Sequence, residues 1–166
     1  MVAAKLDVDK GDFVVYPTHG VGRVMGVQKQ DISGTQIEVI SVYFESTRMT
    51  LRIPTARAAQ SGLRNLSSKK MMEDALKTLR GKATIKRTMW SRRAQEYEAK
   101  INSGDPVSIA EVVRDLYRGE EQPEQSFSER QIYQSALARL SRELAAIDGL
   151  DDREAEEKLE TFLKAA

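Results

Sequence analysis

The sequence has no cysteine and only one histidine, and both shortages exclude classes of protein. Without cysteine there is no disulfide, no thiolate nucleophile and no cysteine-based zinc site. The single imidazole, His19, excludes a metal site built from several histidines and also a paired catalytic imidazole. It lies in a Pro-Thr-His-Gly sequence typical of a turn, where we expect it to be hydrogen-bonded to nearby backbone. We therefore expect neither a cofactor nor an enzymatic activity.

Long apolar runs are missing too. No stretch of the 166 residues approaches the roughly 18 consecutive apolar residues that a membrane-spanning helix needs. The N-terminal residues contain no apolar core of a signal peptide. We therefore expect a soluble cytoplasmic protein that does not contact a membrane. Its length suits one domain of ordinary size or two small ones.

The net charge of +1 conceals an uneven distribution of charge. Residues 1–66 carry eight basic and six acidic side chains, residues 67–104 carry ten and four, and residues 105–166 carry eight and fifteen. A basic middle is therefore followed by an acidic end. Such an asymmetry indicates a charged partner. The net charge of the whole chain, taken alone, would argue against one.

Up to residue 66, the apolar residues form short runs rich in Val, Ile, Tyr and Phe, separated by glycine and proline, a pattern typical of strands. Gly22 and Gly26 indicate bulges or sharp bends in a small curved sheet, and Ser33-Gly34 indicates a turn. The predicted strands are 12–17, 21–27, 36–44 and 49–54, with a short last strand at 62–66. We predict a Tudor- or SH3-like β-barrel for a first domain, residues 1–66.

From residue 67 onward, the apolar residues recur with the period of a helix. The predicted helices begin at Ser67 or Ser68, near Thr88, at Asp105-Pro106, at Ser128 and near Asp151. Ser108 and Glu111 have the spacing of a capping box, and Gly149 marks a helix end. We predict a bundle of about five helices for a second domain, residues 67–166, so the fold class is α+β with two domains.

The part of the chain between Asp74 and Glu96 holds seven lysines and arginines and no acid. Such a surface attracts phosphates, although a run of charges is equally typical of a solvated face. The only tryptophan, Trp90, lies near its centre and has two interpretations. Its helical spacing to Tyr97 and Ile101 is typical of a buried face. Its place in a first helical turn, beside arginines, is typical of a ring that stacks on a base or enters a minor groove.

The predicted fourth strand is a second candidate site. Its arginines lie on one side of the alternation and a proline ends it, which suits an edge strand. The edge is either protected against aggregation or used for docking, in which case Met49 and Arg52 face a partner strand.

Several motifs together resemble the CarD/CdnL family of bacterial transcription regulators over about residues 8–164. They are Gly11-Asp-Phe-Val-Val-Tyr-Pro-Thr-His-Gly-Val-Gly22, Leu51-Arg-Ile-Pro54, Asn65-Leu66, Trp90-Ser-Arg-Arg93 and Ala110-Glu-Val-Val-Arg-Asp-Leu-Tyr-Arg118. The N-terminal half is also similar to the polymerase-interacting module of transcription-repair coupling factors.

The resemblance implies a Tudor-like domain that docks on the β subunit of RNA polymerase and a helical domain that contacts promoter DNA at the upstream edge of the transcription bubble. It implies an inserted tryptophan that stabilises the open complex, without sequence-specific contacts. The implied DNA-binding residues are Trp90, Arg92 and Arg93, with Lys86 and Arg87 from the basic stretch, and the implied polymerase-binding residues are Arg52, Met49, Pro54 and Arg48. Gln30 stands where some members have a second basic polymerase contact, so that contact is not carried over.

We accordingly expect a monomer that is associated with the nucleoid through RNA polymerase. The alternative is an adaptor that joins two proteins through its barrel and helices and never touches DNA.

Overall fold

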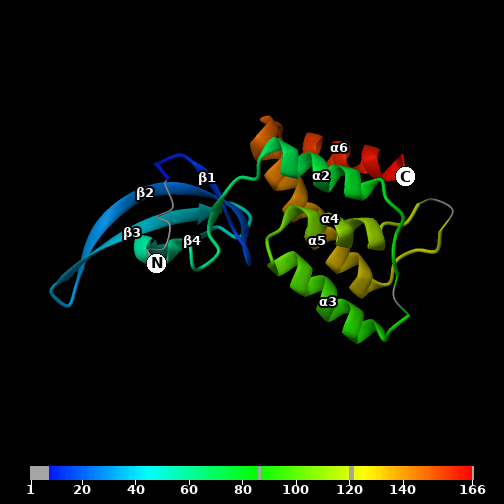
Figure 1. Ribbon diagram of the computed structural model, residues 1–166, viewed down its shortest axis with the longest axis horizontal. Helices are drawn as coiled ribbons and strands as arrows, with labels where there is room; N and C mark the ends of the chain where they lie inside the picture. Colours follow the sequence, from blue (N-terminus) through cyan, green and yellow to red (C-terminus); the bar gives the residue numbers. More distant parts are fainter. Residues whose placement is uncertain (1–7, 86, 120–121, 166) are drawn as a thin grey trace. The chain divides into compact units, whose positions relative to one another are not determined.

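The structure is a computed structural model that describes residues 8–85, 87–119 and 122–165 (Figure 1). Lys86, one of the expected DNA-binding residues, lies outside the described residues. The chain divides into two compact units, Met1–Leu66, here called the sheet unit, and Ser67–Ala166, here called the helical unit. The predicted α+β class is confirmed, because the first unit is built on an antiparallel sheet and the second on helices.

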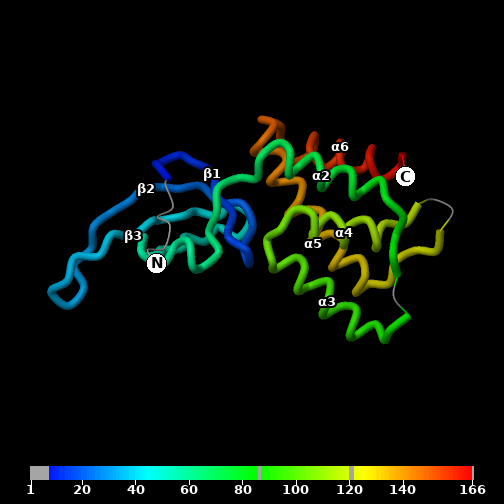
Figure 2. The backbone as a smooth tube through the Cα atoms, viewed as in Figure 1, coloured from blue at the N-terminus to red at the C-terminus, as the bar shows by residue number. Residues whose placement is uncertain are grey.

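The sheet unit contains five strands in the order β4-β3-β2-β1-β5, each antiparallel to its neighbours. The strands are β1 (Phe13–Tyr16), β2 (Gly20–Ile32), β3 (Thr35–Phe44), β4 (Met49–Pro54) and β5 (Arg64–Asn65), with the short helix α1 (Thr55–Ala58) before β5. Figure 2 follows the long β2–β3 hairpin, which turns at Ser33 and Gly34, both with positive φ, as a tight hairpin requires. Strand β4 lies at an edge of the sheet, as predicted.

The core of the sheet unit explains why Gly22 is needed. Alternate residues of β3 point to one side, where Ile40, Val42 and Phe44 are buried. A Cβ on Gly22 would lie 2.5 Å from Val42 Cγ1 and 2.8 Å from the Phe44 ring. Gly22 therefore permits close packing inside the core, whereas the bulge in β2 falls between Val24 and Gly26.

The helical unit confirms the five predicted helices among its described residues. They are α2 (Lys69–Leu79), α3 (Trp90–Asn102), α4 (Pro106–Leu116), α5 (Phe127–Asp148) and α6 (Asp152–Lys164). Helix α2 is capped by Ser68, and α5 ends at Gly149, whose φ of 69° is left-handed. The predicted capping box of α4 is wrong, because the Asp105 carboxylate accepts the Ser108 N–H and takes the N-cap position itself.

Helix α4 lies in the middle of the helical unit, between α2 and α3 (Figure 1). Its apolar side chains are buried except for Val107, which is half-buried, and buried apolar side chains of α2 and α5 belong to the same core. Two acidic side chains, Asp115 and Glu143, are also buried in this unit. The Glu143 carboxylate accepts the Ser67 N–H at 3.0 Å, just before α2 begins. Within the described part of the chain, no helix has the length and apolar character to cross a membrane.

Candidate nucleic-acid interface

Trp90 is the first residue of α3 and lies at the border between the core and the solvent. Its ring is half-buried, packs against the core of the helical unit, and has its centroid 6.2 Å from that of Tyr97. Its indole Nε1 donates a hydrogen bond to Ser128 Oγ, 3.2 Å away in the first turn of α5. The ring is therefore partly packed inward, as a buried face predicts, and partly accessible, and its stacking on a base stays a prediction.

The neighbouring arginines differ in their surroundings. The Arg93 guanidinium carbon lies 5.3 Å from the centroid of the Trp90 ring and 5.8 Å from that of Tyr97. Its Nη2 donates to the Tyr97 hydroxyl at 3.3 Å, while its buried Nε has no hydrogen-bond partner among the described residues. Arg92 is exposed, as is Arg87. Arg93 is therefore held against two aromatic rings, whereas Arg92 and Arg87 extend into solvent.

The beginning of α3 favours an anion. Its N-cap, Met89, supplies no side-chain hydrogen bond, and the first turn has no acidic residue. Unpaired N–H groups and the helix dipole make such an end electropositive, and basic side chains there are unfavourable without a negative partner. Arg92 and Arg93 both lie in this first turn and add to the positive potential.

Two exposed apolar side chains lie next to the residues that hold Trp90. Met89 precedes Trp90 and is 78% exposed, and Phe127 precedes Ser128 and is 76% exposed. They are the most exposed large apolar side chains of the described residues. Because Trp90 Nε1 bonds to Ser128, these two side chains belong to the same surface region as the indole. The surface thus combines an accessible indole with exposed apolar groups and cations.

The second candidate site, β4, is only partly as expected. Arg52 is exposed, and Arg48 is exposed in the turn before the strand, with a φ of 53°. Met49, expected to be exposed and to face a partner strand together with Arg52, is instead half-buried and packs against the core of the sheet unit. The reason is the two-residue period of a strand, which places residues 49 and 52 on opposite faces. Pro54 pairs with Val39 at the end of the strand and is half-buried.

The turn around His19 is as predicted. The His19 N–H donates to the Tyr16 carbonyl at 3.0 Å. The imidazole stacks on the Tyr16 ring at 5.5 Å and lies 5.3 Å from the Phe44 ring. Its contacts are therefore those of a packed turn residue.

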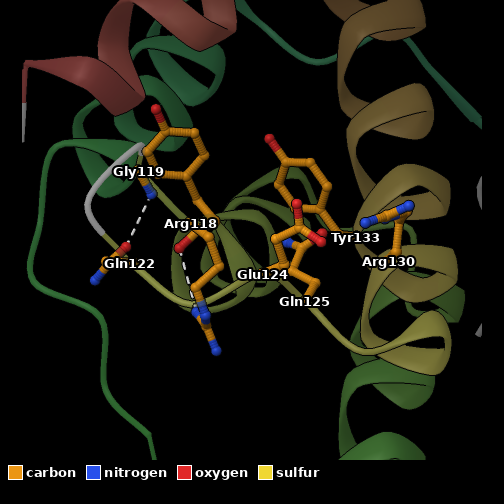
Figure 3. Close-up of a pocket in the computed structure, with 8 residues that line it drawn as sticks. Arg118, Gly119, Gln122, Glu124, Gln125, Arg130 and Tyr133 are labelled. Atoms are coloured by element: carbon orange, nitrogen blue, oxygen red, sulfur yellow. Dashed lines mark hydrogen bonds between the residues drawn. The ribbon is translucent and has the colours of Figure 1, made fainter.

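A pocket of about 320 Å³ lies between the end of α4 and the start of α5 (Figure 3). Arg118 in this pocket forms an ion pair with Glu129 at 3.2 Å, and the Gly119 N–H donates to Gln122 Oε1. Burial raises the pKa of the Tyr133 hydroxyl above its ordinary value, and the nearby Glu160 carboxylate adds to this effect. Tyr133 is therefore a hydroxyl that stays protonated, which makes it unsuitable as a general base.

Among the described residues, no three His, Cys, Asp or Glu side chains are grouped to hold a metal ion.

Comparison with known families agrees with this division into a sheet unit and a helical unit. Residues 9–67 match the CarD-like/TRCF RID domain, and residues 63–160 match the C-terminal domain of CarD. The chain belongs to the CarD family. It is 25% identical over 144 residues to YdeB of Bacillus subtilis (strain 168), whose name describes it as a candidate transcription factor. The match covers 87% of this chain and 94% of YdeB, and this CarD-family protein is a transcription regulator.

The sequence did not reveal all the residues around Trp90 in this CarD-family chain. Ser128 and Phe127 lie 38 and 37 positions from Trp90, and neither belongs to the apolar face that predicted α5. The position of Met89 on this surface could have been predicted from the sequence, because Met89 directly precedes Trp90 and does not belong to the buried face of α3.

Proposed function

We propose that this CarD-family protein docks on the β subunit of RNA polymerase through β4 and stabilises the open promoter complex by inserting Trp90 at the upstream edge of the transcription bubble. The observation that carries the proposal is the accessible part of the Trp90 ring at the start of α3, next to exposed Arg92 and the exposed apolar groups of Met89 and Phe127.

Insertion of Trp90 would act on the equilibrium between closed and open DNA. Separating a base step costs a few kcal/mol, and stacking of a base on an aromatic ring returns about 1–3 kcal/mol. That return exists only where bases are already unstacked, so it favours the open complex over the closed one. Each 1.4 kcal/mol gained by the open state would change its population relative to the closed state about tenfold. The Trp90–Ser128 hydrogen bond would hold the ring near this position before DNA arrives.

Phosphate contacts would come from exposed Arg92 and Arg87, with the beginning of α3 as a further electropositive group. Because such contacts carry no base information, promoters would differ in response through the stability of their open complexes. Arg93 would act mainly on Trp90, which it contacts, and not on DNA directly.

Docking would make these weak contacts effective. Strand β4 has a strand neighbour on one side only among the described residues, and exposed Arg52 is available to a carboxylate of a partner strand. Attachment to polymerase would raise the concentration of the helical unit near DNA to the millimolar range, so modest DNA affinity is sufficient.

The decisive experiment compares the lifetime of open complexes with wild-type protein, Trp90→Ala and the control Met71→Ala, which removes an exposed apolar side chain from α2. We expect Trp90→Ala to fold, to bind polymerase and to lose the gain in lifetime, while Met71→Ala keeps it. Trp90→Phe retains a stacking ring without the N–H and should keep part of the gain. If Trp90→Ala prolongs the open complex as wild type does, the proposal is wrong.

A second measurement separates this proposal from an adaptor that never touches DNA. Binding of the wild-type protein to forked DNA should weaken with added salt, because each phosphate contact releases counterions. An adaptor would show no binding and no salt dependence.

A further inference from the structure

The segment that leads into Trp90, residues 81–89, has neither helix nor strand among its described residues, yet it carries exposed Lys82 and Arg87. Its position depends on a contact with α4. The Thr84 N–H donates a hydrogen bond of 3.0 Å to Asp115 Oδ1. At the start of the segment, a Cβ added to Gly81 would lie 3.7 Å from the Arg114 side chain, so this end also lies against α4.

Asp115 is an unusual residue for this place. It is 4% exposed, near the end of an α4 whose other inward residues, such as Val112, Val113 and Leu116, are apolar. Burying a carboxylate costs several kcal/mol unless charges and hydrogen bonds compensate. Here Arg114 Nε lies 2.9 Å from Asp115 Oδ1, and the Thr84 N–H adds a second donor to the same oxygen. Its polar partners therefore include the backbone of the segment that precedes Trp90.

The same end of α4 also contacts the first turn of α5, which holds the hydrogen-bond partner of Trp90. Arg118 Nη1 donates to the Asp115 carbonyl, and Nη2 donates to Glu129 Oε2, both at 3.2 Å. Glu129 follows Ser128, which accepts the hydrogen bond from Trp90 Nε1. The end of α4 is therefore connected to segment 81–89 through Asp115 and to the first turn of α5 through Arg118.

We propose that Asp115 is a positioning residue that holds segment 81–89 in the conformation that binds DNA. The inference rests on the proposed function, because it assigns a role to Asp115 in the same DNA contact. A segment that is already ordered in the free protein loses less conformational entropy when it binds. Loss of the Thr84–Asp115 hydrogen bond would leave Arg87 on a mobile segment and loosen the chain that leads into Trp90, and the dissociation constant for forked DNA would rise about tenfold.

The test compares Asp115→Ala with the control Asp148→Ala in the full chain. Asp148 pairs with Lys158 at 3.0 Å in the same unit, so both variants remove one paired carboxylate and change the net charge equally. Three properties are measured: hydrogen exchange of the Thr84 amide, acrylamide quenching of Trp90, the only tryptophan, and affinity for forked DNA. We expect Asp115→Ala to speed Thr84 exchange, increase quenching and weaken binding about tenfold, with core amides of α5 still protected, and Asp148→Ala to resemble wild type.

The outcomes separate the two proposals. If wild-type protein does not bind forked DNA, the proposed function fails, and with it the role of Asp115. If wild type binds but Asp115→Ala and Asp148→Ala have equal affinity, only the positioning role fails. An unprotected Thr84 amide in the wild-type protein also overturns the positioning role, without any variant. Should Asp115→Ala not fold, Asp115→Leu and Asp148→Leu, which keep the shape of the side chain and remove its acceptor oxygens, replace the pair and are judged by the same measurements.

Discussion

Arg92 and Arg93 are adjacent in the sequence but should affect DNA binding in different ways. Arg92 is exposed, whereas Arg93 contacts the rings of Trp90 and Tyr97. One lost phosphate contact reduces the slope of log affinity against log salt by about 0.9. Between 50 and 200 mM salt, a variant without that contact should therefore lose about 3.5-fold less affinity than wild type. We expect this change for Arg92→Ala, and for Arg93→Ala an unchanged slope with weaker binding at every salt concentration.

The assay is fluorescence anisotropy of labelled forked DNA at four or more salt concentrations, with acrylamide quenching of Trp90 measured in parallel. Arg93→Ala should make Trp90 more accessible, because the guanidinium no longer covers the ring, while Arg92→Ala should not. Arg92→Lys keeps the charge and serves as the control that retains the wild-type slope. If Arg93→Ala reduces the slope as much as Arg92→Ala does, then Arg93 binds a phosphate itself and the distinction is refuted.

Three further predictions test other parts of the structure. Arg52→Glu should abolish co-purification with the polymerase β subunit, whereas Arg57→Glu, the same charge change at an exposed position of α1, should not; retention by both variants would exclude β4 docking through Arg52. Gly22→Ala should lower the free energy of unfolding of the sheet unit by about 1–3 kcal/mol in urea titrations, whereas Gly26→Ala, whose added Cβ meets nothing within 4 Å, should cost much less; equal losses would contradict the packing argument. Ser128→Ala should increase quenching of Trp90 and lower the free energy of unfolding by about 1 kcal/mol, and unchanged quenching would show that the hydrogen bond does not hold the ring.

Local patterns predicted most of the fold. Helices α2 and α5 followed from apolar spacing together with their boundary residues Ser68 and Gly149, because capping and left-handed turns depend on residues that are close in sequence. Helix α1 was missed, since four residues do not show a helical period. Met49 was expected to be exposed together with Arg52, but the alternation that exposes Arg52 turns Met49 toward the core of the sheet unit.

The candidate site was predictable only in part. Trp90 and its arginines stand out in the sequence, but the contacts that position them join residues far apart: 38 positions for Trp90 and Ser128, and 31 for Thr84 and Asp115. No periodicity identifies such pairs, because they depend on how helices pack against each other. Asp115 in particular has no sequence signal that distinguishes a buried acid from the many exposed ones around it.

The distribution of charge within the helical unit adds a reason to expect that DNA would contact only one side of this unit. Figure 1 shows α3 and α6 on opposite sides of this unit, and α6 carries five of the fifteen acidic residues of 105–166. Two of its three cations are engaged in ion pairs, Arg153 with Glu157 and Lys158 with Asp148. A polyanion such as DNA would be attracted to the exposed cations near the start of α3 and repelled by α6, which would disfavour orientations that bring α6 toward the DNA. A near-neutral chain can in this way present an oriented basic surface, and under the proposed function the acidic helix would favour binding through that surface without itself touching DNA.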